Sequence, residues 1–188
     1  MGDTQTFESL TNWDKITVIL YRAGIVLTWL LSCMACILWF SSGITFSLIM
    51  LFYISTGLSV FFIHLYIGSL TRFLKVIYLF ALICLLILVT VKGETITVLL
   101  ETHFYALLLL PLAGAIGFIT AKEAFCFRIY EGYVIAIILP LCVMGYAVGI
   151  ALSNWLLICI SIIYGIFMFK KIFMPLHYDI GDKSAYIP

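Results

Sequence analysis

The sequence predicts an all-α membrane protein, a six-transmembrane-helix bundle with its N- and C-termini on the cytoplasmic or stromal side. Hydrophobic residues make up 65% of the 188 residues and charged residues only 10%, whereas soluble domains carry roughly a quarter charged residues. The chain therefore needs a lipid bilayer as its solvent. Its apolar runs are long and unbroken, which favours helices over a β-barrel, whose strands alternate apolar and polar residues.

Six apolar runs follow one another along the chain, and a helix needs about 20 such residues to cross the hydrocarbon. They cover residues 16–40, 44–68, 76–91, 98–121, 133–152 and 155–169. The chain therefore divides into a polar N-terminal tail (1–15), a six-span domain (16–169) and a polar C-terminal tail (170–188). The N-terminal tail is partly acidic and lacks the pattern of a cleavable signal peptide, so the first run is expected to stay as an anchor.

The basic residues orient the spans, because lysine and arginine collect in cytoplasmic loops. With six spans, nine of the ten basic residues fall on one side and Lys92 falls on the other. The nine are Lys15, Arg22, Arg72, Lys75, Lys122, Arg128, Lys170, Lys171 and Lys183. The outer connections after the first and fifth spans are very short, so any site for a partner or ligand is expected on the inner side.

Small residues predict where the helices approach one another, because helix association in lipid depends on close packing. The pairs are Gly145 and Gly149 (extended by Ser153), Ala113 and Gly117, Ser55 and Ser59, and Ser161 and Gly165. Packing within the chain is favoured over a homodimer face, and the oligomeric state is left open. Pro111 and Pro140 are expected to kink the fourth and fifth spans.

Ionisable residues within or near membrane spans are candidates for function. Six of them are predicted at similar depth near the inner face: Arg22, His64, Arg72, Glu123, Arg128 and Glu131. Arg22 lies too deep to stay unpaired, and Glu131 or Glu123 is its expected partner. Three interpretations remain open: a snorkelling arginine with solvated loop charges, a salt-bridge network that locks the bundle, or a substrate or proton site.

Other candidate chemistry is sparse. Cys126 lies beside Lys122 and Arg128, whose charges favour a reactive thiolate. Asp179 and Asp182 are expected to come together in a surface turn of the C-terminal tail, where two carboxylates and His177 are too few to indicate a metal. No motif of a nucleotide-binding loop, a hydrolase or a metalloprotease is present. We therefore expect no catalytic residue, no metal and no cofactor, and a net charge of +1 gives no reason to expect nucleic acid as a partner.

Four segments together resemble a known family. They read YRAG (21–24), HLYIGSLTR (64–72), KEAFCFRIYE (122–131) and DIGDKS (179–184). They are similar to an uncharacterised family of conserved integral membrane proteins of cyanobacteria and plastids, classed as a domain of unknown function. The resemblance implies a cyanobacterial plasma or thylakoid membrane, or a plastid membrane, and it implies no reaction. All four segments fall on the predicted inner side.

The leading functional hypothesis is a non-enzymatic membrane protein that assists or scaffolds a larger membrane complex through its inner loops and C-terminal tail. Such a protein has the lipid bilayer as a partner. The alternative is a transporter or channel for a small solute or protons, with a polar site near Arg22, His64 and Glu131. A third, weaker hypothesis is a redox-responsive protein that uses Cys126.

Overall fold

The computed structural model describes residues 11–41, 46–92, 103–150 and 153–180. These residues form seven α-helices and one 3₁₀ helix, which confirms the prediction of an all-helical chain. The elements are α1 (Asn12–Ser41), α2 (Phe46–Phe62), α3 (Gly68–Lys92), η1 (His103–Leu109), α5 (Leu110–Phe127), α6 (Glu131–Ala147), α7 (Asn154–Ile172) and α8 (His177–Ile180).

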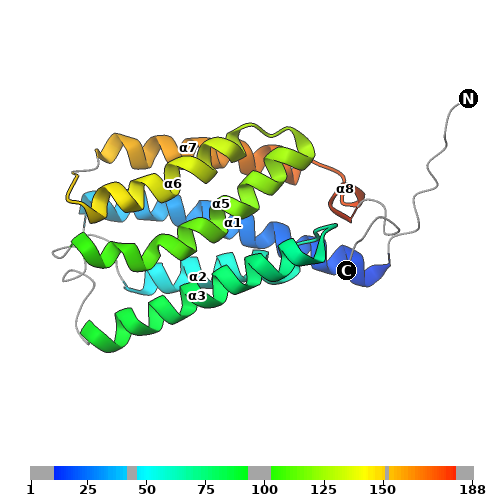
Figure 1. Ribbon diagram of the computed structural model, residues 1–188. Coiled ribbons are helices and arrows are strands. Elements are labelled where there is room, and N and C mark those ends of the chain that lie inside the picture. Colours follow the sequence, from blue (N-terminus) through cyan, green and yellow to red (C-terminus); the bar gives the residue numbers. More distant parts are fainter. Residues whose placement is uncertain (1–10, 42–45, 93–102, 151–152, 181–188) are drawn as a thin grey trace, which may run out of the picture.

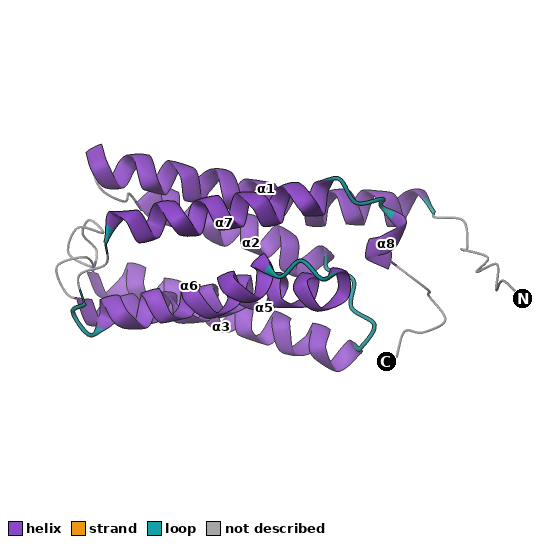
Figure 2. Ribbon diagram, turned by 90° about the horizontal axis from the view of Figure 1, so that it is seen from above, coloured by secondary structure: helices purple, strands orange, loops and turns teal. Residues whose placement is uncertain are grey.

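The long helices lie side by side, and successive helices run in opposite directions (Figure 1). The start of α1, the α2–α3 and α5–α6 connections and α8 lie at one end of the bundle, which we call the basal end; the opposite end is the distal end. Helix α1 packs on α2 and α7, and α5 packs on α6 and α3. Seen from above, α1 and α7 lie on one side and α3, α5 and α6 on the other, with α2 touching both groups (Figure 2).

Four helical segments are long and apolar enough to cross a membrane: Asn12–Leu38, Gly68–Thr90, His103–Phe127 and Trp155–Ile172. Phe46–Phe62 and Glu131–Ala147 are shorter apolar helices. Together they correspond in order to the six predicted runs, but several boundaries were predicted wrongly.

The largest boundary errors lie at the basal end. Helix α2 ends at Phe62 rather than near residue 68, so His64 lies in a connection, and α3 begins at Gly68 rather than near residue 76. Helix α5 continues to Phe127, beyond the predicted end at residue 121. At the start of α3, the long side chain of Arg72 reaches water from within the first turns of the helix. In α5, Lys122 instead pairs with Glu123 inside the bundle, so these charges do not end the helix. After Phe62 the chain stays apolar, and hydropathy does not mark where α2 ends.

The described basic residues are grouped by this topology. Lys92 ends α3 at the distal end. The others lie toward the basal end: Lys15, Arg22, Arg72, Lys75, Lys122, Arg128, Lys170 and Lys171. Lys183 lies outside the described residues.

Close helix contacts occur at several of the predicted small residues. A Cβ atom on Gly117 would lie 3.1 Å from the carbonyl oxygen of Ala136 on α6. A Cβ on Gly165 would lie 2.7 Å from Nε1 of Trp29 on α1, whose indole donates to the carbonyl of Ser161 at 3.2 Å. These contacts are made within the chain.

Two local predictions were wrong. Gly149 does not extend a packing stripe from Gly145, because α6 ends at Ala147 and Gly149 adopts a positive φ of 83° with open space around it. Pro111 stands in the first turn of α5, directly after η1. In that position proline begins a helix instead of kinking one, because its missing N–H would have no helical acceptor.

The contact between α1 and α2 predicts the effect of a single methyl group. A Cβ on Gly24 would lie 2.3 Å from Ser59 Oγ and 2.7 Å from the carbonyl oxygen of Ser55, whereas a Cβ on Gly114 meets nothing within 4 Å. We expect Gly24→Ala to lower the free energy of unfolding in detergent by about 1–3 kcal/mol. The matched variant Gly114→Ala should be neutral or slightly stabilising. Equal effects of the two substitutions would contradict the close α1–α2 contact.

Candidate functional site

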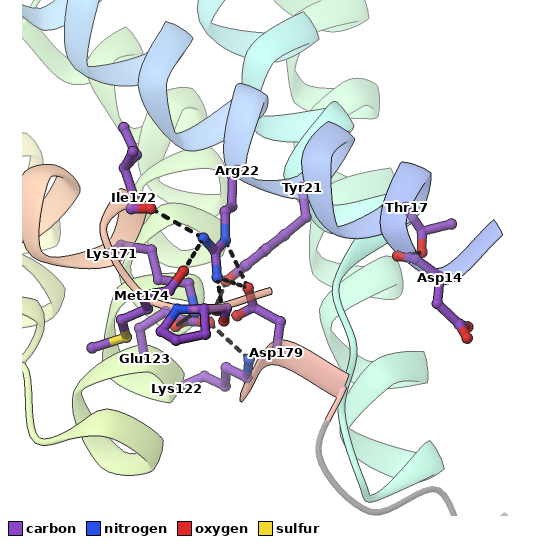
Figure 3. A network of polar contacts seen from close by, with 11 residues as sticks. Asp14, Thr17, Tyr21, Arg22, Lys122, Glu123, Lys171, Ile172, Met174 and Asp179 are labelled. Atoms are coloured by element: carbon purple, nitrogen blue, oxygen red, sulfur yellow. Dashed lines mark hydrogen bonds and ion pairs between the residues drawn. The ribbon is translucent and has the colours of Figure 1, made fainter. Parts of the chain in front are cut away.

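A buried carboxylate at the basal end joins three helices. Asp179, on the single-turn helix α8, accepts a hydrogen bond from Arg22 Nε at 2.7 Å and forms an ion pair with Arg22 NH2 at 2.6 Å. Its other oxygen pairs with Nζ of Lys171 on α7. Asp179 is 5% exposed, Arg22 8% and Lys171 0%. One carboxylate thus ties α8 to α1 and to the end of α7 (Figure 3).

Arg22 also binds the turn that leads from α7 to α8. Its NH1 donates to the carbonyl oxygens of Ile172 (3.2 Å) and Met174 (2.6 Å), and its NH2 donates to that of Pro175 (3.0 Å). The last carbonyls of a helix lack helical partners, and a guanidinium offers five N–H donors in a fixed fork. The contacts of Arg22 match those five donors, so each of its N–H groups has an acceptor inside the protein.

A second buried carboxylate links this group to α5. Glu123 is 0% exposed and pairs with Lys171 and, at 2.7 Å, with Lys122. It also accepts a hydrogen bond from the Tyr21 hydroxyl at 2.6 Å. Lys171 therefore bridges Asp179 and Glu123. We call Tyr21, Arg22, Lys122, Glu123, Lys171 and Asp179 the basal ion network.

The basal ion network contains three cations and two carboxylates. Aromatic rings offset the excess of positive charge, because the face of a ring is electron-rich. Nζ of Lys171 lies 4.1 Å from the centre of the Phe127 ring, and Nζ of Lys122 lies 5.5 Å from that of Tyr21. A buried charge without partners costs several kcal/mol. The ion pairs and the ring contacts together therefore make the burial of these charges possible.

The structure places the six predicted inner-face residues in different settings. Only Arg22 and Glu123 belong to the basal ion network, and the predicted partner of Arg22 was wrong: it is Asp179, not Glu123 or Glu131. Glu131 pairs instead with Lys170 at 2.5 Å, in a partly exposed contact between α6 and α7. Arg72 on α3 and Arg128 after α5 are exposed.

His64 lies beside the start of α1, in the connection between α2 and α3. Its Nε2 is 3.4 Å from Oγ1 of Thr17. Burial, and then the nearby positive charge of Lys122, lower the pKa of His64, while Asp179 and Asp14 act in the opposite direction. The neutral imidazole is therefore the favoured form in the folded protein.

The remaining candidates lie apart from this network or outside the described part. Cys126 is exposed in the last turn of α5, and its proposed reactivity stays a prediction. Asp179 is buried rather than part of a surface turn, and Asp182 lies outside the described residues. Within the described ranges, no three His, Cys, Asp or Glu side chains are grouped so that they could hold a metal ion.

Sequence reasoning missed three residues of the network: Tyr21, Lys122 and Lys171. For Lys171 the sequence did contain a signal. Pro175 lies between Lys171 and Asp179, and a proline there interrupts the helix. A chain that turns back at such a proline brings the two opposite charges together. Hydropathy alone gave no reason to look for this, because both residues appeared to lie in a solvated tail.

A comparison with protein families bears on identity. A family model described as "Uncharacterized integral membrane protein (DUF2301)" matches residues 58–187, more than half of the chain. The chain belongs to this family. The matched region includes four residues of the basal ion network, Lys122, Glu123, Lys171 and Asp179, whereas Tyr21 and Arg22 precede it. No curated protein and no solved structure matches the chain.

The network predicts that the segment after α7 is held by charge. In Asp179→Asn, Arg22 and Lys171 lose a buried anionic partner, and removing one member of a buried pair costs about 3–5 kcal/mol. We expect trypsin to cut the variant after Lys171 under conditions in which the unaltered protein resists. The control Glu131→Gln alters a partly exposed pair worth about 0–1 kcal/mol and should leave Lys171 protected. Protection of Lys171 in Asp179→Asn would contradict the network.

His64 predicts a pH dependence. Because its pKa is lower in the folded protein than in the unfolded chain, the unfolded chain takes up the proton first as the pH falls. The free energy of unfolding should therefore decrease below about pH 6.5, the ordinary histidine value, and level off below the folded-state pKa. His64→Gln should remove this part of the decrease. Identical pH profiles for the two proteins would refute the prediction.

Proposed function

We propose that this family member is a non-enzymatic protein that crosses the membrane six times and that assists or scaffolds a larger membrane complex through its basal end. Both termini would lie on the cytoplasmic or stromal side. The observation that carries the proposal is the internal pairing of the buried charges, which fastens the segment after α7 onto the bundle and leaves the basal surface for contacts with other proteins.

The topology has two supports. The two shorter helices, α2 and α6, have 17 residues each and so span about 25 Å at 1.5 Å per residue, close to the thickness of a thin bilayer core. The described basic residues other than Lys92 lie toward the basal end, as expected for the cytoplasmic side of a membrane protein.

The pairing of charges favours a scaffold over a transporter or an enzyme. Ionisable groups within a membrane often mark substrate or proton pathways, and such a group must be free to bind substrate or exchange a proton. Arg22 instead donates to a carboxylate and three carbonyls of its own chain, and Glu131 pairs with Lys170. The alternative was a pathway for a small solute or protons through Arg22, His64 and Glu131. Its deepest charge, that of Arg22, is already bound within the chain.

The basal surface also carries side chains that suit protein contacts. Phe125 and Tyr130 are exposed on the α5–α6 hairpin, and Phe173 is 82% exposed after α7. Arg128 is exposed between Phe125 and Tyr130. Aromatic residues and arginine are enriched at protein interfaces.

The resemblance to proteins of cyanobacteria and plastids supports a location in a plasma, thylakoid or plastid membrane, which we include in the proposal.

The test is site-specific photo-crosslinking in native membranes. A photo-reactive amino acid replaces Phe173 at the basal end or, as the matched control, Trp155, which is 75% exposed at the distal end. We expect a discrete crosslinked protein partner from position 173 and none from position 155. A protein that gives no partner from the basal end, purifies alone and conducts a solute or protons in liposomes would overturn the proposal in favour of the transporter.

A further inference from the structure

A partly open cavity of about 250 Å³ lies between the helices, on the distal side of the basal ion network. Small side chains from four elements line it: Ser32 and Cys36 of α1, Ala106 of η1, Cys142 of α6 and Ser161 of α7. Ser32 and Cys36 are one turn apart and so share a face of α1. Larger apolar side chains, such as Leu139 and Leu157, complete the wall.

The polar atoms of the cavity wall are used within the protein. The Thr28 hydroxyl donates to the carbonyl of Gly24 at 2.9 Å, and that of Ser32 to the carbonyl of Trp29 at 2.7 Å. A buried water typically needs two to four polar partners, and an apolar cavity of about 150 Å³ stays dry and binds small hydrophobic molecules. The wall therefore suits a hydrocarbon better than water or a polar solute.

A second pocket adjoins this cavity and opens to the side of the bundle. It lies between α1 and α7, has a volume of about 410 Å³, and shares Cys36 and Ser161 with the inner cavity. Cys36 Sγ lies 3.2 Å from Ser161 Oγ, so a contact between two small side chains separates the two spaces. Ile37 and Ile162, at the mouth of the outer pocket, are 68% and 58% exposed. In a membrane such apolar side chains face lipid.

We propose that an acyl chain of a membrane glycerolipid enters between α1 and α7 and that its end occupies the inner cavity. The bilayer supplies such chains at the mouth of the outer pocket. A slender, unbranched chain fits a passage that opens when the Cys36 and Ser161 side chains separate, whereas a branched isoprenoid needs a wider one. The lining recognises hydrocarbon and not a headgroup. This inference is independent of the proposed scaffold function.

The experiment uses the full-length protein in nanodiscs that contain phosphatidylcholine with a diazirine at the end of one acyl chain. After irradiation, mass spectrometry maps the labelled residues. We expect adducts on cavity residues such as Leu157, in addition to lipid-facing residues such as Ile162. Adducts at Leu157 should saturate and should decrease when unlabelled phosphatidylcholine is added, as expected for a site of limited capacity. Adducts confined to lipid-facing residues would refute the proposal.

A matched pair of substitutions separates the cavity from the outer surface. Cys142→Leu fills part of the cavity, and Cys159→Leu makes the same change at an exposed position on α7. We expect the first to remove the adducts at Leu157 and the second to leave them unchanged. Adducts at Leu157 that persist in folded Cys142→Leu would contradict the site. If that variant does not fold, the saturation and competition of Leu157 labelling in the unaltered protein decide whether the site exists. Competition by an isoprenoid quinone but not by phosphatidylcholine would overturn the assignment of an acyl chain.

Discussion

The structure depends on the burial of Asp179 between Arg22 and Lys171. In a medium of low dielectric constant none of these three charges is tolerable without a partner, and Asp179 is a partner of both cations. They come from α8, α1 and α7, and the contact between Arg22 and Asp179 joins residues 157 positions apart in the sequence. The first helix, the last long helix and the segment after it must therefore assemble together. The segment after α7 thus belongs to the folded domain, although its composition resembles a solvated tail.

The YRAG segment shows how packing and charge support one another. Gly24 brings α1 so close to α2 that Ser59 Oγ reaches the carbonyl oxygen of Tyr21 at 3.2 Å. Tyr21 and Arg22 then point from the same turn toward the basal network, where Tyr21 binds Glu123 and Arg22 binds Asp179. In lipid, where the hydrophobic effect gives helices no reason to associate, close packing and buried polar contacts are the forces that remain. Both act on this single turn.

Sequence reasoning predicted the helical class and the order of the six apolar segments, because hydropathy reflects the cost of placing polar groups in lipid. It also identified Arg22 and Glu123, since charges at that depth need partners. It could not identify Asp179 as the partner of Arg22, because no local pattern reports that residues 173–180 fold back onto α1. The position of His64 was wrong for a different reason. Apolar residues continue past Phe62, and hydropathy does not distinguish the end of a helix from an apolar connection.

The network and the cavity divide the bundle into two unlike halves. Toward the basal end, α1 and α7 are joined by charges with directed hydrogen bonds, and this geometry tolerates little change in their separation. Toward the distal end, small residues such as Cys36 and Ser161 hold the same two helices together by a weak contact beside open space. A hydrocarbon between these helices would therefore change their spacing where the restraint is weakest. The basal surface, fixed by buried ion pairs, would keep its shape, which is the property that a docking surface for another membrane protein requires.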